Sequence, residues 1–186
     1  MDRNLAQDVA AGTITSVAST FYRHASLGWP SLQGSETGGR WGPPRSFPVL
    51  YLGRPSDSVI VEAYRHLVDG IEGMRADLVA PRRFVTAEVN VTKILDLRDK
   101  PTLLRVGLSL ESIQGPHAPC QRVAQVAHQL GLHGILAPAA TALGETLALF
   151  ERHLPTVELP VLIEEQIWQH LPTDPRQLHI VDGGVA

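Results

Sequence analysis

Apolar and polar positions cluster along the chain in short runs that predict a mixture of strands and helices. Thr20–Ala25 predicts a short strand, and the compact apolar run Phe47–Leu52 predicts a buried one. Phe84–Val91 partly alternates between apolar and polar side chains, which predicts one or two further strands. His133–Ala139 and Thr146–Glu151 predict two more.

Downstream of the buried strand, apolar side chains recur at helical spacing and predict an amphipathic helix. Ser56 or Ser58 is expected to cap its N-terminus, with Asp57 near the positive end of the helix dipole. Gly70 and Gly73 are expected to end it. The predicted buried stripe consists of Ile60, Ala63, Tyr64, Leu67 and Ile71.

Two further helices are expected in the second half of the chain. One starts near Asp99. The other is amphipathic, with Val123, Ala127 and Leu130 facing inward and Gly131 as its stop.

Two stretches lack such a pattern. Residues 26–46 are rich in Gly, Pro and Ser and predict a long loop, and long loops inside compact domains are often functional. Residues 155–186 form a tail that contains one Pro-bounded apolar segment. Because strands and helices are interspersed without a βαβ repeat, the sequence predicts an α+β fold, with a mixed or antiparallel sheet and flanking helices.

Composition narrows the class of protein. The 186 residues are 44% hydrophobic and 19% charged, which suits one globular domain over 1–186. The net charge of −3 disfavours a nucleic-acid binder, which more often carries a basic face, and leaves room only for a local basic cleft. No apolar run is long enough to span a membrane, so a membrane is not an expected partner either.

Cysteine and histidine usage points to a reducing compartment and to no metal. Cys120 is the only cysteine, so no intramolecular disulfide forms, and a buried thiol is the expected state. The N-terminus lacks the apolar core of a signal peptide, so a cytoplasmic protein is expected. His128 and His133 are five residues apart, unlike the pair on a zinc-binding helix, and the other histidines form no metal-binding pattern.

Two arginines and a tyrosine are candidates for binding a ligand. Arg23 ends a predicted strand, and Arg40 follows two glycines that leave the backbone open to a ligand. Guanidinium groups fit phosphate oxygens two at a time, so this pair suits a diphosphate, although an arginine is more often a solvated surface residue or an ion-pair partner. The ring of Tyr51 suits stacking on a flat ligand, or it packs in the core with its hydroxyl satisfied.

Glu62 is the candidate acid. The helical pattern places it opposite the apolar stripe, where it would pair with Arg65 or His66. Val59 and Val61 flank it, however, which makes this turn apolar almost all round and favours a position in a cleft wall.

These segments together resemble the RES-domain family of bacterial toxins from toxin–antitoxin pairs. The resemblance rests on YRH at 22–24, GGRWGPP at 38–44, FPVLYL at 47–52 and SVIVEAYRH at 58–66, and it extends over about residues 20–150. The family usually has Asn where this chain has Gly42.

The resemblance implies an NAD-consuming enzyme with an ADP-ribosyltransferase-like fold. Carried over by position, Arg23 and Arg40 bind NAD, Tyr51 lines the nicotinamide side, and Glu62 is the acidic catalytic residue, with Arg23 and Tyr51 assisting it. His24 and Trp41 are expected to line the same pocket. NAD is a substrate here, no metal is implied, and an Xre-like antitoxin is the expected partner, with a tail that blocks the pocket mouth.

One departure from the family leaves alternatives open. Many members have Pro-Ser where this chain has Pro138–Ala139, and Ser109, Ser112 or Thr141 are the candidate replacements for that serine. The acceptor of ADP-ribose is phosphate, water or a protein side chain. The alternative to an enzyme is a catalytically inactive module that binds a nucleotide or the antitoxin.

Overall fold

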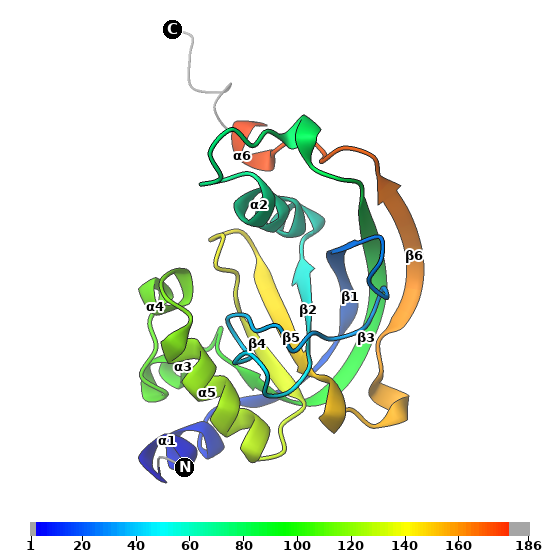
Figure 1. Ribbon diagram of the computed structural model, residues 1–186. Coiled ribbons are helices and arrows are strands. Elements are labelled where there is room, and N and C mark those ends of the chain that lie inside the picture. Colours follow the sequence, from blue (N-terminus) through cyan, green and yellow to red (C-terminus); the bar gives the residue numbers. More distant parts are fainter. Residues whose placement is uncertain (1–2, 179–186) are drawn as a thin grey trace, which may run out of the picture.

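The computed structural model describes residues 3–178 and shows a six-stranded sheet that closes on itself (Figure 1). The strand order is β1-β2-β5-β4-β3-β6, and β1 also pairs with β3, so the first five strands form a barrel. All pairings are antiparallel except the parallel pairing of β3 with β4. The predicted α+β fold with a mixed sheet and flanking helices is confirmed, whereas closure into a barrel was not predicted.

The strands are β1 (Ile14–Ser26), β2 (Val49–Arg54), β3 (Arg82–Asp96), β4 (Gly134–Pro138), β5 (Glu145–Phe150) and β6 (Val161–Trp168). The helices are α1 (Arg3–Ala10), α2 (Ser56–Leu67), α3 (Lys100–Arg105), α4 (Leu110–Gln114), α5 (Ala118–Gln129) and α6 (Pro175–Leu178). In Figure 1, α1, α3, α4 and α5 gather on one side of the barrel, whereas α2 and α6 lie across its upper end.

Alternation along the strands produces two separate cores. On β2, Leu50 and Leu52 belong to the cluster inside the barrel, while Val49 belongs to the cluster that the helices cover. Successive side chains of a strand point to opposite faces, so one short strand serves both cores. Tyr51 points to the same side as Val49, which places it at the edge of the helix-covered core.

The predicted strands are all present. The strand expected over Thr20–Ala25 begins six residues earlier, at Ile14, and Phe84–Val91 lies within the single long strand β3. The predicted loop over 26–46 contains only isolated bridges. The apolar segment of the tail, for which no element was predicted, is strand β6.

Several details of the first predicted helix are wrong. Pro55, and not Ser56 or Ser58, occupies the N-cap of α2, and it makes no side-chain cap. The helix ends at Leu67, before either glycine, so Ile71 lies outside it and is 45% exposed. The buried residues of α2 are Ser58, Val59, Val61, Ala63 and Tyr64. Ala63 and Tyr64 are buried as predicted, in a cluster with Val79 and Leu171.

The predictions for the helices α3 and α5 are mostly confirmed. Asp99 caps α3 by accepting a hydrogen bond from the Thr102 backbone N–H. Val123 and Ala127 of α5 are buried as predicted. Leu130 is not, because it is the C-cap of the helix and remains exposed.

The end of strand β1 lies at the site. Within the described residues, β1 and β2 share one antiparallel pair, Tyr22 with Gly53. Two residues after Gly53 the chain turns at Pro55 into α2. Arg23 and His24, which follow Tyr22 on β1, line the same cavity as residues of α2.

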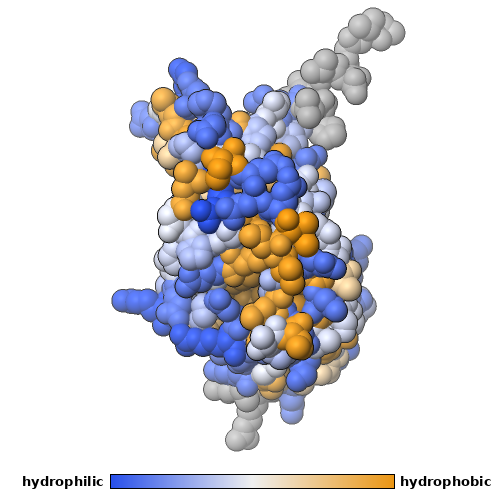
Figure 2. Space-filling model, turned by 90° about the vertical axis from the view of Figure 1, so that its right-hand side faces the viewer, coloured by the Kyte–Doolittle hydropathy of each residue, from blue (hydrophilic) through white to orange (hydrophobic). Residues whose placement is uncertain are grey.

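Strand β6 is an exposed, apolar sheet edge. Among the described residues it pairs only with β3, and Val161, Leu162, Ile163 and Ile167 are all exposed. Figure 2 looks onto this side of the molecule and shows an apolar band along it. Within residues 3–178, no helix has the length and apolar character needed to cross a bilayer.

Candidate functional site

A cleft of about 660 Å³ lies beside α2, and all four residues predicted to act on NAD line it. Arg23 comes from β1, Arg40 from the long loop, Tyr51 from β2 and Glu62 from α2. The further lining residues predicted from the sequence, His24 and Trp41, are also present. Segments that are far apart in the sequence thus meet at one cavity.

Tyr51 packs against the helix-covered core and also lines the cleft. Its hydroxyl accepts a hydrogen bond of 2.9 Å from the Trp41 backbone N–H, which fixes the loop against β2. Burial raises the pKa of Tyr51 above its usual value, so the phenol stays protonated. A Cβ at Gly39 would lie 2.7 Å from that hydroxyl, so only glycine permits this approach.

The loop that carries Arg40 is held from the helical side. Gln121 of α5 donates through Nε2 to the Gly39 carbonyl at 2.9 Å, and Arg40 donates through one terminal nitrogen to the Gly115 carbonyl at 2.9 Å. No carboxylate of the described residues forms an ion pair with Arg40. Its charge is therefore positioned without being neutralised.

Arg23, His24 and Arg82 form a second cationic group. Arg82 donates to Nδ1 of His24 at 3.2 Å, and Arg23 donates to the Gln33 carbonyl at 3.0 Å. Burial lowers the pKa of Arg23 to about 10, and burial together with the neighbouring cations lowers the pKa of His24 to about 3. His24 is therefore neutral near pH 7, and Arg23 remains charged.

Glu62 pairs with His66 one turn later on α2, at 3.1 Å, as the helical pattern predicted. Its carboxylate also lines the cleft, as its apolar neighbours predicted. Both interpretations of Glu62 hold at once, because α2 forms a wall of the cleft.

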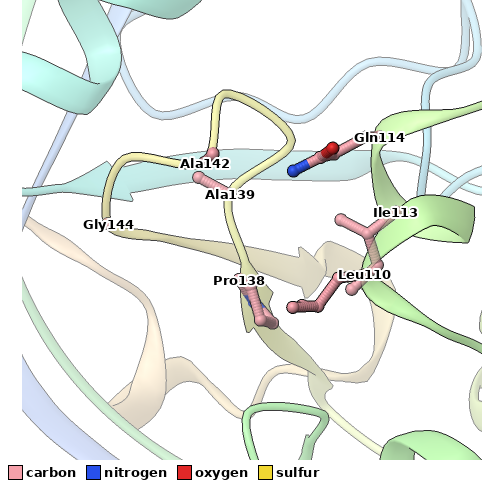
Figure 3. A pocket seen from close by; sticks show the side chains of 7 residues that line it. All are labelled: Leu110, Ile113, Gln114, Pro138, Ala139, Ala142 and Gly144. Carbon is pink, nitrogen blue, oxygen red and sulfur yellow. The ribbon is translucent and has the colours of Figure 1, made fainter.

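The position of the missing family serine lies just outside the cleft. Ala139 lines a smaller cavity of about 170 Å³, which shares only Pro138 with the large cleft. Figure 3 shows Leu110, Ile113 and Gln114 reaching from α4 toward this turn.

None of the three candidate replacements lines the large cleft. Ser109 and Ser112 cap α4 reciprocally, and Thr141 bonds the backbone of Leu143. The serine and threonine residues that do line the cleft are Thr37, Ser58 and Thr146.

The sequence analysis missed part of the cleft. Arg65 and His66 were considered as partners of Glu62, and neither His117 nor Arg82 was singled out. The available signal for Arg82 was weak, because it stands at the start of a strand beside a second arginine, Arg83.

Among residues 3–178, no group of three or more His, Cys, Asp or Glu side chains is arranged to hold a metal ion. The cleft instead combines four arginines with the single carboxylate of Glu62. Guanidinium groups without carboxylate partners in a cavity attract an anionic ligand, and a carboxylate among them is able to stabilise local positive charge.

Comparison with known proteins agrees with this geometry. The family model for the RES domain matches residues 18–172. The NAD(+) phosphorylase MbcT of Mycobacterium tuberculosis is 30% identical over 156 residues, which cover 82% of this chain and 84% of the relative, and the Mycobacterium bovis protein of that name matches equally. A chain in the crystal structure of the M. tuberculosis MbcT–MbcA toxin–antitoxin complex superposes with a TM-score of 0.79 at 28% identity, covering 90% of this chain and 93% of that one.

Proposed function

The chain belongs to the RES domain family, and from that premise we propose that it is a toxin that consumes NAD by phosphorolysis. The observation that carries the proposal is the convergence of Arg23, Arg40, Tyr51 and Glu62 on one cleft. Its similarity to the phosphorylase MbcT supports phosphate as the acceptor, in preference to water or a protein side chain. The relation of the barrel to ADP-ribosyltransferases is part of the same proposal.

The proposed roles follow from the charge changes in the reaction. The bond between C1″ of the nicotinamide ribose and the ring nitrogen breaks, and its electron pair leaves with neutral nicotinamide. The ribose carbon becomes oxocarbenium-like, as in glycoside hydrolysis, so a nearby carboxylate stabilises it. Glu62 supplies that carboxylate and hydrogen-bonds the ribose hydroxyls.

The other predicted residues hold NAD for this step. Arg23 and Arg40 bind the diphosphate, so binding energy remote from C1″ fixes the ribose. Tyr51 stands beside the nicotinamide, where its protonated phenol presents an apolar ring and no charge. His24 and Trp41 complete the wall.

The inactive alternative depends on the departure at Ala139. Ala139 lines the smaller cavity and does not line the large cleft. Because the proposed chemistry needs no hydroxyl at this position, the departure does not argue against an enzyme.

An antitoxin is the proposed protein partner, since the similar M. tuberculosis chain was crystallised in a toxin–antitoxin complex. An Xre-like antitoxin with a tail in the cleft mouth would exclude NAD. An acidic group on that tail would complement the unpaired arginines.

Product analysis tests the proposal. The purified protein is incubated with NAD, with and without inorganic phosphate, and the products are identified by mass. We expect nicotinamide and ADP-ribose 1″-phosphate only when phosphate is present. ADP-ribose in both samples would assign hydrolysis instead, a mass increase of an added protein would assign ADP-ribosylation, and intact NAD in every sample would contradict NAD consumption.

A further inference from the structure

The cleft holds more unpaired positive charge than the diphosphate of NAD requires. Its four arginines are Arg23, Arg40, Arg65 and Arg82, and none of them forms an ion pair with a carboxylate of the described residues. The Nε atoms of Arg23 and Arg82 are buried and have no hydrogen-bond partner there. Buried polar groups in folded proteins are normally satisfied, so an unsatisfied pair of arginines beside a cavity indicates a ligand.

Two of these arginines are held by different partners. Arg82, at the start of β3, donates to Nδ1 of His24 at 3.2 Å. Arg40, on the long loop, donates to the Gly115 carbonyl at 2.9 Å. Because they come from different elements and are fixed separately, the two guanidinium groups are able to contact separate anions.

Arg82 and His24 form a compact pair. Arg82 donates to Nδ1 of His24, so the proton of the neutral imidazole is on Nε2. No described residue accepts a hydrogen bond from that Nε2–H. Arg82 and His24 thus both have N–H groups without an acceptor, and no carboxylate within residues 3–178 forms an ion pair with either of them.

We propose that Arg82 and His24 form a subsite for the inorganic phosphate that accepts ADP-ribose, distinct from the diphosphate site at Arg40. The inference rests on the proposed phosphorolysis. Arg40 lies beside the Gly-rich loop and Tyr51, a wall suited to the extended dinucleotide, whereas the compact pair suits one tetrahedral anion.

The step balances with phosphate in this subsite. An oxygen of monohydrogen phosphate donates its lone pair to C1″ and forms the new C–O bond. The bond from C1″ to the nicotinamide nitrogen breaks, and its electrons neutralise the pyridinium. The proton of monohydrogen phosphate stays on the product, so no general base is needed.

The test separates the affinity for phosphate from the affinity for NAD. Initial rates of nicotinamide release are measured with Arg82→Gln while phosphate and NAD are varied independently. Removal of one charge-assisted donor is expected to raise KM for phosphate about tenfold or more, while KM for NAD stays within about twofold. Arg40→Gln is expected to raise KM for NAD and to leave KM for phosphate nearly unchanged.

Matched variants keep the result interpretable. Arg82→Lys restores a positive charge and is expected to recover part of the affinity for phosphate, and His24→Leu is expected to raise KM for phosphate about threefold. Arg75→Gln removes an exposed arginine that pairs with Asp77 outside the cleft and is expected to change neither constant. Thermal melting of each variant reports on folding.

Calorimetric titration of inorganic phosphate into the NAD-free protein gives a readout that needs no turnover. We expect Arg82→Gln to weaken this binding by the same factor as KM. An unchanged KM and unchanged phosphate binding in folded Arg82→Gln would overturn the subsite and leave phosphorolysis standing. Wild-type protein that releases no nicotinamide would instead overturn the proposed function, and with it the acceptor role of this subsite.

Discussion

Arginines in two regions of this molecule have opposite environments. Arg54 and Arg98 both pair with Glu145, and Arg98 also forks onto the buried Asp96, with its closest approach at 2.7 Å. Arg23 and Arg40, in the cleft, donate to the backbone carbonyls of Gln33 and Gly115. The first region is a closed network of ion pairs, whereas these two guanidinium groups form no ion pair with a carboxylate of residues 3–178.

The difference indicates what each region is for. Paired charges at the end of a barrel stabilise the fold and need nothing further. Unpaired arginines in a cavity cost stability through desolvation, so their retention indicates that a ligand supplies the missing negative charge. The lowered pKa of Arg23, about 10, reflects this desolvation. Substitutions in the cleft should therefore reduce activity, and substitutions in the network should reduce stability.

Glu62→Gln is expected to have the largest effect. It removes the carboxylate that stabilises the oxocarbenium-like ribose while keeping the size of the side chain, so nicotinamide release should fall about 100-fold or more. The melting temperature should hardly change, since among the described residues the one ion pair of Glu62 is with the exposed His66. Single-turnover measurement of nicotinamide release checks this, and full activity in folded Glu62→Gln would remove Glu62 from the mechanism.

Arg40→Ala is expected to weaken NAD binding. Loss of a charged donor to the diphosphate should lower kcat/KM for NAD about 30-fold. Steady-state kinetics check the loss, and Arg152→Ala is a control because its exposed ion pair with Glu36 lies outside the cleft. An equal loss in both variants would show that Arg40 has no specific role.

Glu145→Gln should reduce the stability of the protein and leave its activity nearly unchanged. It leaves Arg54 without its carboxylate and Arg98 with only Asp96, so the free energy of unfolding should fall by about 2 kcal/mol. Denaturant unfolding measures this. Nicotinamide release per folded molecule should stay within about twofold of the wild-type rate, and a large kinetic defect at unchanged stability would break the contrast between the two regions.

His128→Phe is expected to have the smallest effect. The His128 ring stacks between Phe47 and His153, its Nε2 is buried without a partner among the described residues, and burial lowers its pKa to about 4. The unfolded chain takes up a proton near pH 6.5 and the native protein does not, so His128 destabilises the fold as pH falls from about 6.5 to 4.

Phenylalanine at position 128 keeps the stacking and removes this titration. The variant should lose less stability than wild type between pH 6.5 and 4, a difference of about 1–2 kcal/mol, while the two match more closely at pH 8. Denaturant unfolding across this pH range measures the difference. Parallel stability profiles would mean that His128 does not contribute to acid sensitivity.

The sequence predicted those parts of the site that lie within local motifs. Each of the four predicted residues lies in a short segment whose sequence pattern predicted its structure: Arg23, Arg40, Tyr51 and Glu62. Their convergence follows from the strands and the helix that those segments form. Their catalytic and binding roles stay predictions.

Arg82 could not be predicted in the same way. It reaches the cleft through the antiparallel register of β1 and β3, in which Ser26 lies opposite Arg82. No periodicity within a segment encodes that register. Closure of the barrel has the same origin, because it depends on β3 pairing with strands from both halves of the chain.

The errors in α2 and α5 have a local cause. Periodicity was extended past the true ends of both helices, which placed Ile71 and Leu130 on buried faces. Helix ends are fixed by backbone hydrogen bonds and caps, which apolar spacing does not report. The start of α3 near Asp99 was predicted correctly, and in the structure the Asp99 side chain caps that helix.

The most direct test of the central claim is a crystal structure of Glu62→Gln soaked with NAD, in which slow turnover preserves the substrate. The diphosphate should lie within hydrogen-bond distance of the Arg23 and Arg40 guanidinium groups, with the nicotinamide ribose beside position 62 and the ring beside Tyr51. NAD bound elsewhere on the protein, or a cleft that stays empty of NAD at saturating concentration, would contradict the claim that these unpaired arginines exist to hold it.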